Sequence, residues 1–153
     1  MAEESLLASL PKAFIPYDTS ALQAGQLTVL SSSPPVLLIR HFLDESQCRS
    51  IIQQTQSSMV PAPVVGAAQG ELSTARSSTT CYLRRSDVPT ICSRISNLLC
   101  GKDVTHLELP QVGRYECGQE YRTHYDAFNL ADSDGLRFAQ NGGQRVATVV
   151  SVS

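Results

Sequence analysis

The sequence has 153 residues, of which 42% are hydrophobic and 17% charged, and a formal net charge of −2 at pH 7. This composition is typical of a soluble globular protein, and the length suits one domain with a buried core. The small negative charge disfavours a surface for nucleic acid or anionic membranes, because neither would be attracted to it. No apolar run approaches the length of a transmembrane segment.

The cysteines are odd in number and scattered, without a C-x-x-C pair, which argues against a zinc ribbon or a disulfide framework. They are Cys48, Cys81, Cys92, Cys100 and Cys117. Reduced, mostly buried thiols are expected, as in cytoplasmic proteins. The acidic start, MAEESLLASL, has neither a basic region nor a long apolar stretch, so no secretory signal is expected. The localisation expected by default is therefore cytoplasmic.

The first elements in chain order are a loosely structured lead-in and two strands. Pro11, Pro16 and small polar residues suggest a loosely tied segment up to about Gln26. Aliphatic and β-branched residues then predict strands from Leu27 to Leu30 and from Val36 to Phe42, and the Ser-Pro-rich residues between them predict a turn. Residues 1–33 are thus expected to form a lead-in and a first strand.

Two amphipathic helices are expected next. Asp44 offers an N-cap, and a glutamine three residues later completes the capping-box pattern of a helix from Glu45 to Met59. Asp87 is the expected cap of a second helix, from Val88 to Cys100, and Gly101 is its expected stop. The apolar residues of both helices recur at helical spacing, so we expect both to pack onto the core.

Strands dominate the rest of the chain. A Pro-, Gly- and Ala-rich loop is expected from Val60 to Ser73, and a polar loop from Ala131 to Gly143. The expected strands are Ser78 to Leu83, Thr105 to Leu109, Gln111 to Glu116, Gln119 to Tyr125 and Arg145 to Val152. Helices early in the chain and clustered strands later predict an α+β fold.

The most informative tripeptide is His124-Tyr125-Asp126. Side chains two residues apart in an extended segment lie on the same face, so the imidazole and the carboxylate can project side by side with Tyr125 turned away. They would be two members of the 2-His-1-carboxylate triad that binds ferrous iron. The tripeptide alone is a weak signal, because an exposed histidine beside an exposed aspartate gives the same letters.

The surroundings of the tripeptide follow a longer pattern. In this register the chain resembles the prolyl 4-hydroxylase branch (alpha-subunit-like) of the iron(II)- and 2-oxoglutarate-dependent dioxygenases, whose signature runs L-Q-x-x-x-Y-x-x-G-Q-x-Y-x-x-H-x-D, then G-G-Q-R-x-x-T. The matching residues are Pro110-Gln111, Tyr115, Gly118-Gln119, Tyr121, His124, Asp126, Gly142-Gly143-Gln144-Arg145 and Thr148. The resemblance covers about Pro34 to Val150 and is strongest from Leu109 onward.

The resemblance implies a fold and a reaction. Residues 34–153 would form part of a dioxygenase domain, a partial double-stranded β-helix (jelly-roll) with supporting helices on one side. The reaction would hydroxylate a prolyl residue of a protein substrate. Its cofactors would be Fe(2+), with 2-oxoglutarate as cosubstrate and L-ascorbate to rescue oxidised iron. These cofactors, rather than protein side chains, would carry out the oxidation.

The resemblance also implies roles for individual residues. His124 and Asp126 would be iron ligands, and the Tyr115 hydroxyl would bind 2-oxoglutarate, with a core aromatic as the alternative for Tyr115. The expected peptide-contacting residues are Arg76, Ser78, Glu108, Tyr121 and Arg145. For the R-x-S element the family's usual nearby glycine is absent. Glu108 and Arg145 could equally be solvated charges.

The family's second iron-binding histidine and its 2-oxoglutarate-binding lysine, both downstream of H-x-D, have no counterpart here. The other histidines, His41 and His106, lie upstream and are expected to be packed or surface residues. We therefore expect a C-terminally incomplete domain with impaired hydroxylase activity. The alternatives are a catalytically dead peptide-binding pseudo-enzyme and a truncated product without a stable fold. The sequence indicates neither the substrate protein nor the oligomeric state.

Overall fold

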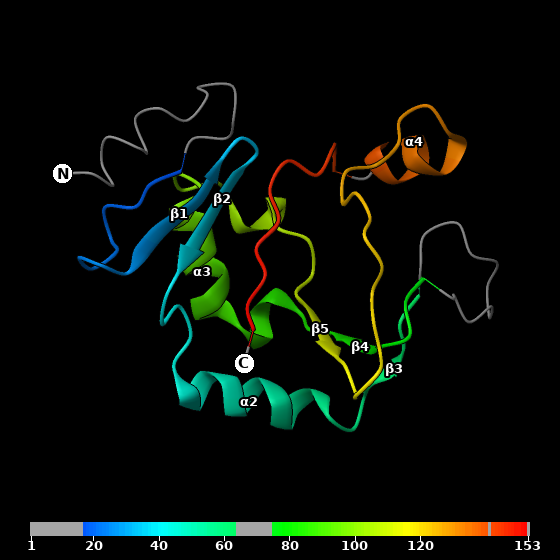
Figure 1. Cartoon of the computed structure of the whole chain (residues 1–153), viewed down its shortest axis with the longest axis horizontal. Coiled ribbons are helices and arrows are strands. Elements are labelled where there is room, and N and C mark those ends of the chain that lie inside the picture. Colours follow the sequence, from blue (N-terminus) through cyan, green and yellow to red (C-terminus); the bar gives the residue numbers. More distant parts are fainter. Residues whose placement is uncertain (1–16, 64–74, 141, 153) are drawn as a thin grey trace.

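The structure is a computed structural model that describes residues 17–63, 75–140 and 142–152, and its fold is α+β, as the sequence predicts. Its strands and helices in chain order are β1 (Leu27–Ser32), β2 (Pro35–Ile39), α2 (Glu45–Thr55), β3 (Val60–Pro61), β4 (Thr79–Tyr82), α3 (Pro89–Leu98), β5 (Gln111–Arg114) and α4 (Ser133–Gln140) (Figure 1). Two short 3₁₀ turns, η1 (Arg85–Asp87) and η2 (Val104–His106), flank α3. None of the helices in the described ranges has the length and apolar character needed to cross a membrane.

The first two strands form an antiparallel hairpin, as expected. Leu27 pairs with Ile39 at the open end, and Ser32 pairs with Pro35 at the turn. The second strand ends at Ile39 rather than Phe42, because His41 has a φ of 53°, which belongs to the left-handed region and not to a strand.

The second sheet holds β3, β4 and β5 in that order, all antiparallel. Cys81 lies opposite Val112 across the β4–β5 pair. Thr80 on β4 is fully buried, and its hydroxyl donates to the Val112 carbonyl at 3.0 Å. The strands predicted around Ser78 and Gln111 are therefore confirmed, and they form the rigid base from which the candidate site extends.

The start of α2 is the predicted capping box. The Asp44 carboxylate accepts a hydrogen bond from the Gln47 backbone N–H at 2.8 Å, and the Gln47 side chain accepts one from the Asp44 N–H at 3.1 Å. These two bonds satisfy backbone donors that a helix start otherwise leaves unpaired.

The predicted start of α3 is wrong. Asp87 lies in η1, and its carboxylate accepts from the Arg84 N–H at 3.0 Å instead of capping α3. The helix begins at Pro89, with Val88 as a cap that offers no side-chain hydrogen bond. Proline suits the first helical position because it has no N–H to satisfy there.

Helix α3 ends at Leu98, shortly before the predicted stop at Gly101. Cys100 and Gly101 both have positive φ values, of 55° and 69°. The Gly101 N–H donates back to the Ser96 carbonyl at 2.9 Å, which closes the helix end.

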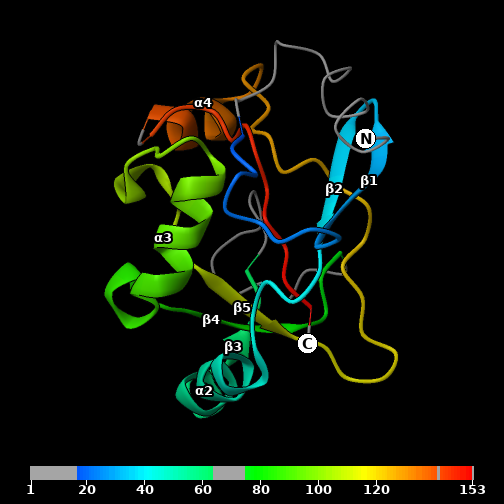
Figure 2. The same ribbon diagram turned by 90° about the vertical axis from the view of Figure 1, so that its left-hand side faces the viewer.

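Both helices contact the second sheet through one hydrophobic cluster. Its buried members are Leu83, Val88 and Cys92, and its half-buried members are Ile51, Ile91, Leu107 and Val112. They come from α2, from α3 and the residue before it, from the residues after β4 and η2, and from β5, so one cluster joins both helices to the second sheet. Figure 2 shows α2 and α3 on the same part of the molecule as β4 and β5.

After α3 the chain differs from the predicted run of strands, apart from β5. The region predicted as a strand from Thr105 contains η2, because Asp103 caps it through the Thr105 N–H at 2.8 Å. Residues 119–125 contribute only an isolated bridge between Tyr121 and Arg76, and the described residues from 145 to 152 form no strand (Figure 1). A strand forms only where a second segment lies alongside to share backbone hydrogen bonds. The sequence of a segment does not specify where such a partner lies.

The polar loop predicted from Ala131 contains α4, which is a further correction. The Asp132 carboxylate accepts from the Gly135 N–H at 2.6 Å, which satisfies a donor of the first turn. Part of the predicted loop from Val60 to Ser73 is strand β3, and its residues 64–73 lie outside the described residues. The same holds for residues 1–16 of the predicted lead-in.

Candidate functional site

The H-x-D tripeptide lies on a loop that is attached to the second sheet. After β5 the chain turns at Gly118, which has a φ of 82°, and returns alongside residues 75–77. The Arg122 N–H donates to the Ala75 carbonyl at 2.9 Å, and the Ser77 N–H donates to the Glu120 carbonyl at 3.0 Å. These bonds fix the backbone immediately before His124.

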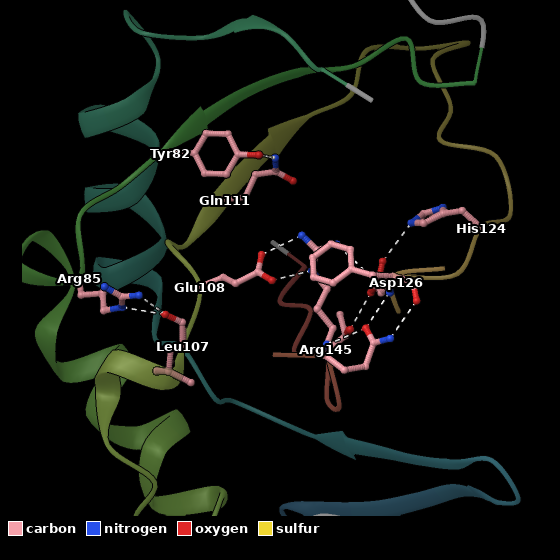
Figure 3. A network of polar contacts seen from close by, with 11 residues as sticks. Tyr82, Arg85, Leu107, Glu108, Gln111, His124, Asp126 and Arg145 are labelled. Atoms are coloured by element: carbon pink, nitrogen blue, oxygen red, sulfur yellow. Dashed lines mark hydrogen bonds and ion pairs between the residues drawn. The ribbon is translucent and has the colours of Figure 1, made fainter. Parts of the chain in front are cut away.

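His124 and Asp126 point toward each other, which confirms the predicted proximity (Figure 3). Their facing atoms, Nε2 and Oδ1, are 3.2 Å apart, and their side chains are 39% and 40% exposed. Tyr125 between them is turned away and is 94% exposed. The pair is therefore accessible from solvent.

The hydrogen bond made by the other ring nitrogen of His124 indicates where the proton of a neutral imidazole lies. His124 Nδ1 lies 2.7 Å from the Arg122 carbonyl oxygen, and because that oxygen only accepts, Nδ1 carries a proton. A neutral imidazole then has its lone pair on Nε2, facing the carboxylate. Two acceptors at 3.2 Å repel each other unless a proton or a cation lies between them.

The carboxylate of Asp126 is oriented in a similar way. The Thr148 hydroxyl donates to Asp126 Oδ2 at 2.6 Å, and Arg145 Nη1 donates to the Asp126 backbone carbonyl at 3.2 Å. Hydrogen bonds of this kind, donated by the histidine to a backbone carbonyl and accepted by the carboxylate from a hydroxyl, are typical of metal-binding residues.

The pair fits a divalent transition metal as far as two ligands can. Neighbouring ligands at bond lengths of about 2.1 Å and right angles are about 3 Å apart, close to the observed separation. Imidazole nitrogen and carboxylate oxygen are also the donors that suit iron. Among the described residues, no group of three or more His, Cys, Asp or Glu side chains forms a complete site. His106, in η2, is exposed and bonds within its own turn, and His41 is exposed beyond β2.

Glu108 and Arg145, both expected to contact peptide, bind each other (Figure 3). The guanidinium forms two bonds to the carboxylate, from Nε at 2.6 Å and from Nη2 at 2.8 Å. This hydrogen bonding raises the pKa of Arg145 above its usual value. Arg145 also lies over the Phe128 ring, with its Cζ atom 4.5 Å from the centroid.

The neighbouring segments hold these residues in place. Arg85 Nε donates to the Leu107 carbonyl at 2.8 Å, and Arg85 Nη2 contacts the same oxygen, which fixes the backbone before Glu108. Gln144 bridges both backbone groups of Phe128, accepting from its N–H at 2.7 Å and donating to its carbonyl at 2.8 Å. The segment around Arg145 is thus tied to the loop that carries Asp126.

The other expected peptide contacts, Arg76, Ser78 and Tyr121, lie together on the His124 side. Arg76 is only 9% exposed, and its Nε donates to the Ser78 hydroxyl at 3.0 Å. Arg76 Cζ is 4.6 Å from the centroid of the Tyr121 ring, which in turn stacks on the His124 ring at 3.7 Å between centroids.

Tyr115 follows β5 and is 47% exposed. Its hydroxyl makes no hydrogen bond to another described residue, so its role toward 2-oxoglutarate stays a prediction. Thr148, Gln144 and the Arg122 carbonyl hold the pair or its segment in place, and none of them has a role in the predicted site. The signal for the first two was the G-G-Q-R-x-x-T pattern, which placed them near the tripeptide without saying what they contact.

No protein-family model matches the chain. The chain is, however, similar to several prolyl 4-hydroxylases of Arabidopsis thaliana. It is 35% identical over 127 residues to probable prolyl 4-hydroxylase 3 and to prolyl 4-hydroxylase 5, and each alignment covers 80% of this chain and 42% of the relative. Prolyl 4-hydroxylase 1 is 30% identical over 142 residues, which cover 87% of this chain and 48% of that protein. The chain thus spans less than half the length of these curated relatives.

Proposed function

Because the chain belongs to a prolyl 4-hydroxylase-like family, we propose that it contributes an iron-binding pair to an iron(II)- and 2-oxoglutarate-dependent dioxygenase that hydroxylates peptidyl proline. The observation that carries the proposal is the short distance of 3.2 Å between His124 Nε2 and Asp126 Oδ1. The second polar atom of each side chain, Nδ1 of His124 and Oδ2 of Asp126, is hydrogen-bonded elsewhere. The β3–β4–β5 sheet would belong to a jelly-roll, covered on one side by α2 and α3.

In this proposal the residues of the chain bind and orient. His124 and Asp126 hold the metal, while the Arg122 carbonyl and the Thr148 hydroxyl keep their donor atoms pointed at it. When bound, iron with 2-oxoglutarate and dioxygen supplies the oxidation, and L-ascorbate restores the reduced metal. Tyr115, which is 47% exposed, is the proposed donor to 2-oxoglutarate.

The proposed substrate is a proline-containing peptide segment of another protein. The Glu108 side chain is 61% exposed and pairs with Arg145, which donates to the Asp126 backbone carbonyl. An extended peptide could therefore contact this ion pair beside the metal. On the His124 side, Arg76 and Ser78 are only 9% and 2% exposed, so of the three residues expected there Tyr121 is the one with surface to offer a peptide.

A second candidate is a peptide-binding protein without catalysis. It would contact the peptide through the half-exposed Glu108–Arg145 ion pair and would not depend on a bound metal. With two protein ligands, the affinity for iron would be lower and its orientation less defined.

The first experiment is a titration of the metal-free chain with Mn²⁺ under anaerobic conditions, followed by electron paramagnetic resonance. We expect binding that is lost in His124→Ala and kept in His106→Ala, the matched histidine on η2. Equal binding by all three proteins would contradict the iron-binding pair.

The second experiment separates the two candidates. Succinate formation from 2-oxoglutarate is measured with iron, L-ascorbate and a proline-rich peptide. Turnover that depends on His124 supports the dioxygenase. Peptide binding without any turnover, in a chain that binds the metal, supports the non-catalytic alternative.

A further inference from the structure

We propose that Tyr121, supported by the buried Arg76, is a positioning residue that fixes the ring plane of His124, a role separate from the peptide contact expected of it. The proposal rests on the proposed function, since it concerns the iron-binding histidine. It follows from three side chains of the structure, Arg76, Tyr121 and His124, which we call the stacking group.

The first step is the contact between the two rings. The Tyr121 and His124 rings stack with centroids 3.7 Å apart and planes inclined by 21°. At this distance the tyrosine ring covers one face of the imidazole and hinders its rotation about the bond to Cβ. The ring edge, with Nδ1 on the Arg122 carbonyl at 2.7 Å, is held separately. With the Tyr121 ring on its face and the Arg122 carbonyl at its edge, the imidazole is held so that Nε2 points toward Asp126.

The second step is the support of Tyr121 itself. The Arg76 guanidinium lies over its ring, with Cζ 4.6 Å from the centroid, a cation–π contact. The guanidinium cannot move freely, because its Nε donates to the Ser78 hydroxyl at 3.0 Å and its Nη2 to the Gln111 side chain at 3.2 Å. Ser78 is 2% exposed and Gln111 begins β5, so this support reaches into the second sheet.

The third step is the backbone. Arg76 and Tyr121 form an isolated β-bridge, and hydrogen bonds on both sides of it join residues 75–77 to residues 120–122. The stacking group therefore connects the imidazole to the rigid part of the fold. Burying a charge is costly unless it is hydrogen-bonded, and the Arg76 guanidinium meets this condition through Ser78 and Gln111.

The test compares three variants of the metal-free chain. Tyr121→Phe keeps the aromatic face, Tyr121→Leu removes it, and Tyr125→Leu removes the neighbouring tyrosine, which is 94% exposed and serves as the matched control. The first readout is the NMR signals of the His124 ring, which the face of an adjacent aromatic ring shifts. We expect these signals to keep their positions in Tyr121→Phe and Tyr125→Leu and to move in Tyr121→Leu.

The second readout is Mn²⁺ affinity. Loss of a residue that orients a ligand typically lowers metal affinity about 10-fold to 100-fold, which is the loss we expect in Tyr121→Leu, against about twofold or less in Tyr121→Phe. If Tyr121→Leu does not fold by circular dichroism, Gln111→Ala loosens the guanidinium without touching either ring. It should shift the His124 signals in the same direction by a smaller amount.

The outcomes are distinct. Unchanged His124 signals and Mn²⁺ affinity in folded Tyr121→Leu would overturn the positioning role and leave only the peptide contact expected of Tyr121. A wild-type chain that binds no Mn²⁺ would contradict the proposed function, whereas the NMR comparison would still decide whether Tyr121 fixes the ring.

Discussion

Thr148 donates a hydrogen bond to the Asp126 carboxylate at 2.6 Å, although the two residues lie 22 positions apart. This bond leaves Oδ1 of Asp126 free to face His124. The same carboxylate without the hydroxyl could rotate about its Cβ–Cγ bond, and either oxygen or neither would then face the imidazole. A threonine from the last described segment thus sets the geometry of a site on a loop that precedes it.

The first prediction concerns this hydroxyl. Thr148→Val removes the hydrogen bond and nearly preserves the shape, so we expect Mn²⁺ affinity to fall by about tenfold or more. Thr148→Ser keeps the hydroxyl and should retain most of the affinity. Isothermal titration calorimetry measures both, and an unchanged affinity in the valine variant would contradict the role of Thr148.

The second prediction concerns the Glu108–Arg145 ion pair. Glu108→Gln removes the charge from a bidentate pair that is half exposed, and we expect a loss of about 0.5–1 kcal/mol in the free energy of unfolding. Glu116→Gln is the matched control, because Glu116 pairs with Arg114 where both side chains are 61% exposed, and it should cost less. Urea denaturation at low and high salt measures the difference, which should shrink as salt increases.

The third prediction concerns the hydrophobic cluster. Leu83 is 7% exposed, so Leu83→Ala removes buried methyl groups and leaves a cavity, at a cost of about 2–4 kcal/mol. Leu30→Ala makes the same chemical change where the side chain is 60% exposed, and there we expect about 0.5 kcal/mol or less. Equal losses in thermal unfolding of the two variants would show that Leu83 is not a core residue.

The fourth prediction concerns thiol reactivity. Cys92 is 2% exposed, and burial raises the pKa of its thiol above the usual value, so less thiolate is present at neutral pH than for an unperturbed thiol. Cys100 and Cys117 are exposed. We therefore expect iodoacetamide to modify the two exposed cysteines first and Cys92 only on unfolding, as followed by mass spectrometry. Early modification of Cys92 in the folded chain would contradict the buried assignment.

The sequence predicted best those features that depend on neighbouring residues alone. The capping box of Asp44 and Gln47 forms within four consecutive residues, and the start of α2 that it predicts is confirmed. Asp87 shows the limit of such local rules. Its carboxylate could accept from backbone N–H groups of the following helix or from the N–H of Arg84, three residues earlier. Arg84 also offers a guanidinium, which adds an ion pair to the hydrogen bond.

The candidate site shows the same division. His124 and Asp126 meet as the tripeptide predicts, but the segment is not the strand from which that prediction came. Their proximity is maintained instead by Arg122, Arg145 and Thr148, whose contacts with the pair depend on how distant segments fold back. Strands expected late in the chain failed for the same reason, since pairing partners are not encoded in the strand's own residues.

The supports of the His–Asp pair come from Arg76 at one extreme and Thr148 at the other, so the pair is organised only when most of the chain has folded. Ligand binding is then linked to the folding equilibrium, because an unfolded chain offers a metal no arranged partners. Any ion that occupies the pair should raise the midpoint of thermal unfolding in proportion to the logarithm of its concentration once the site is saturated. The apparent stability of the protein would thereby report how much of that ion its surroundings contain.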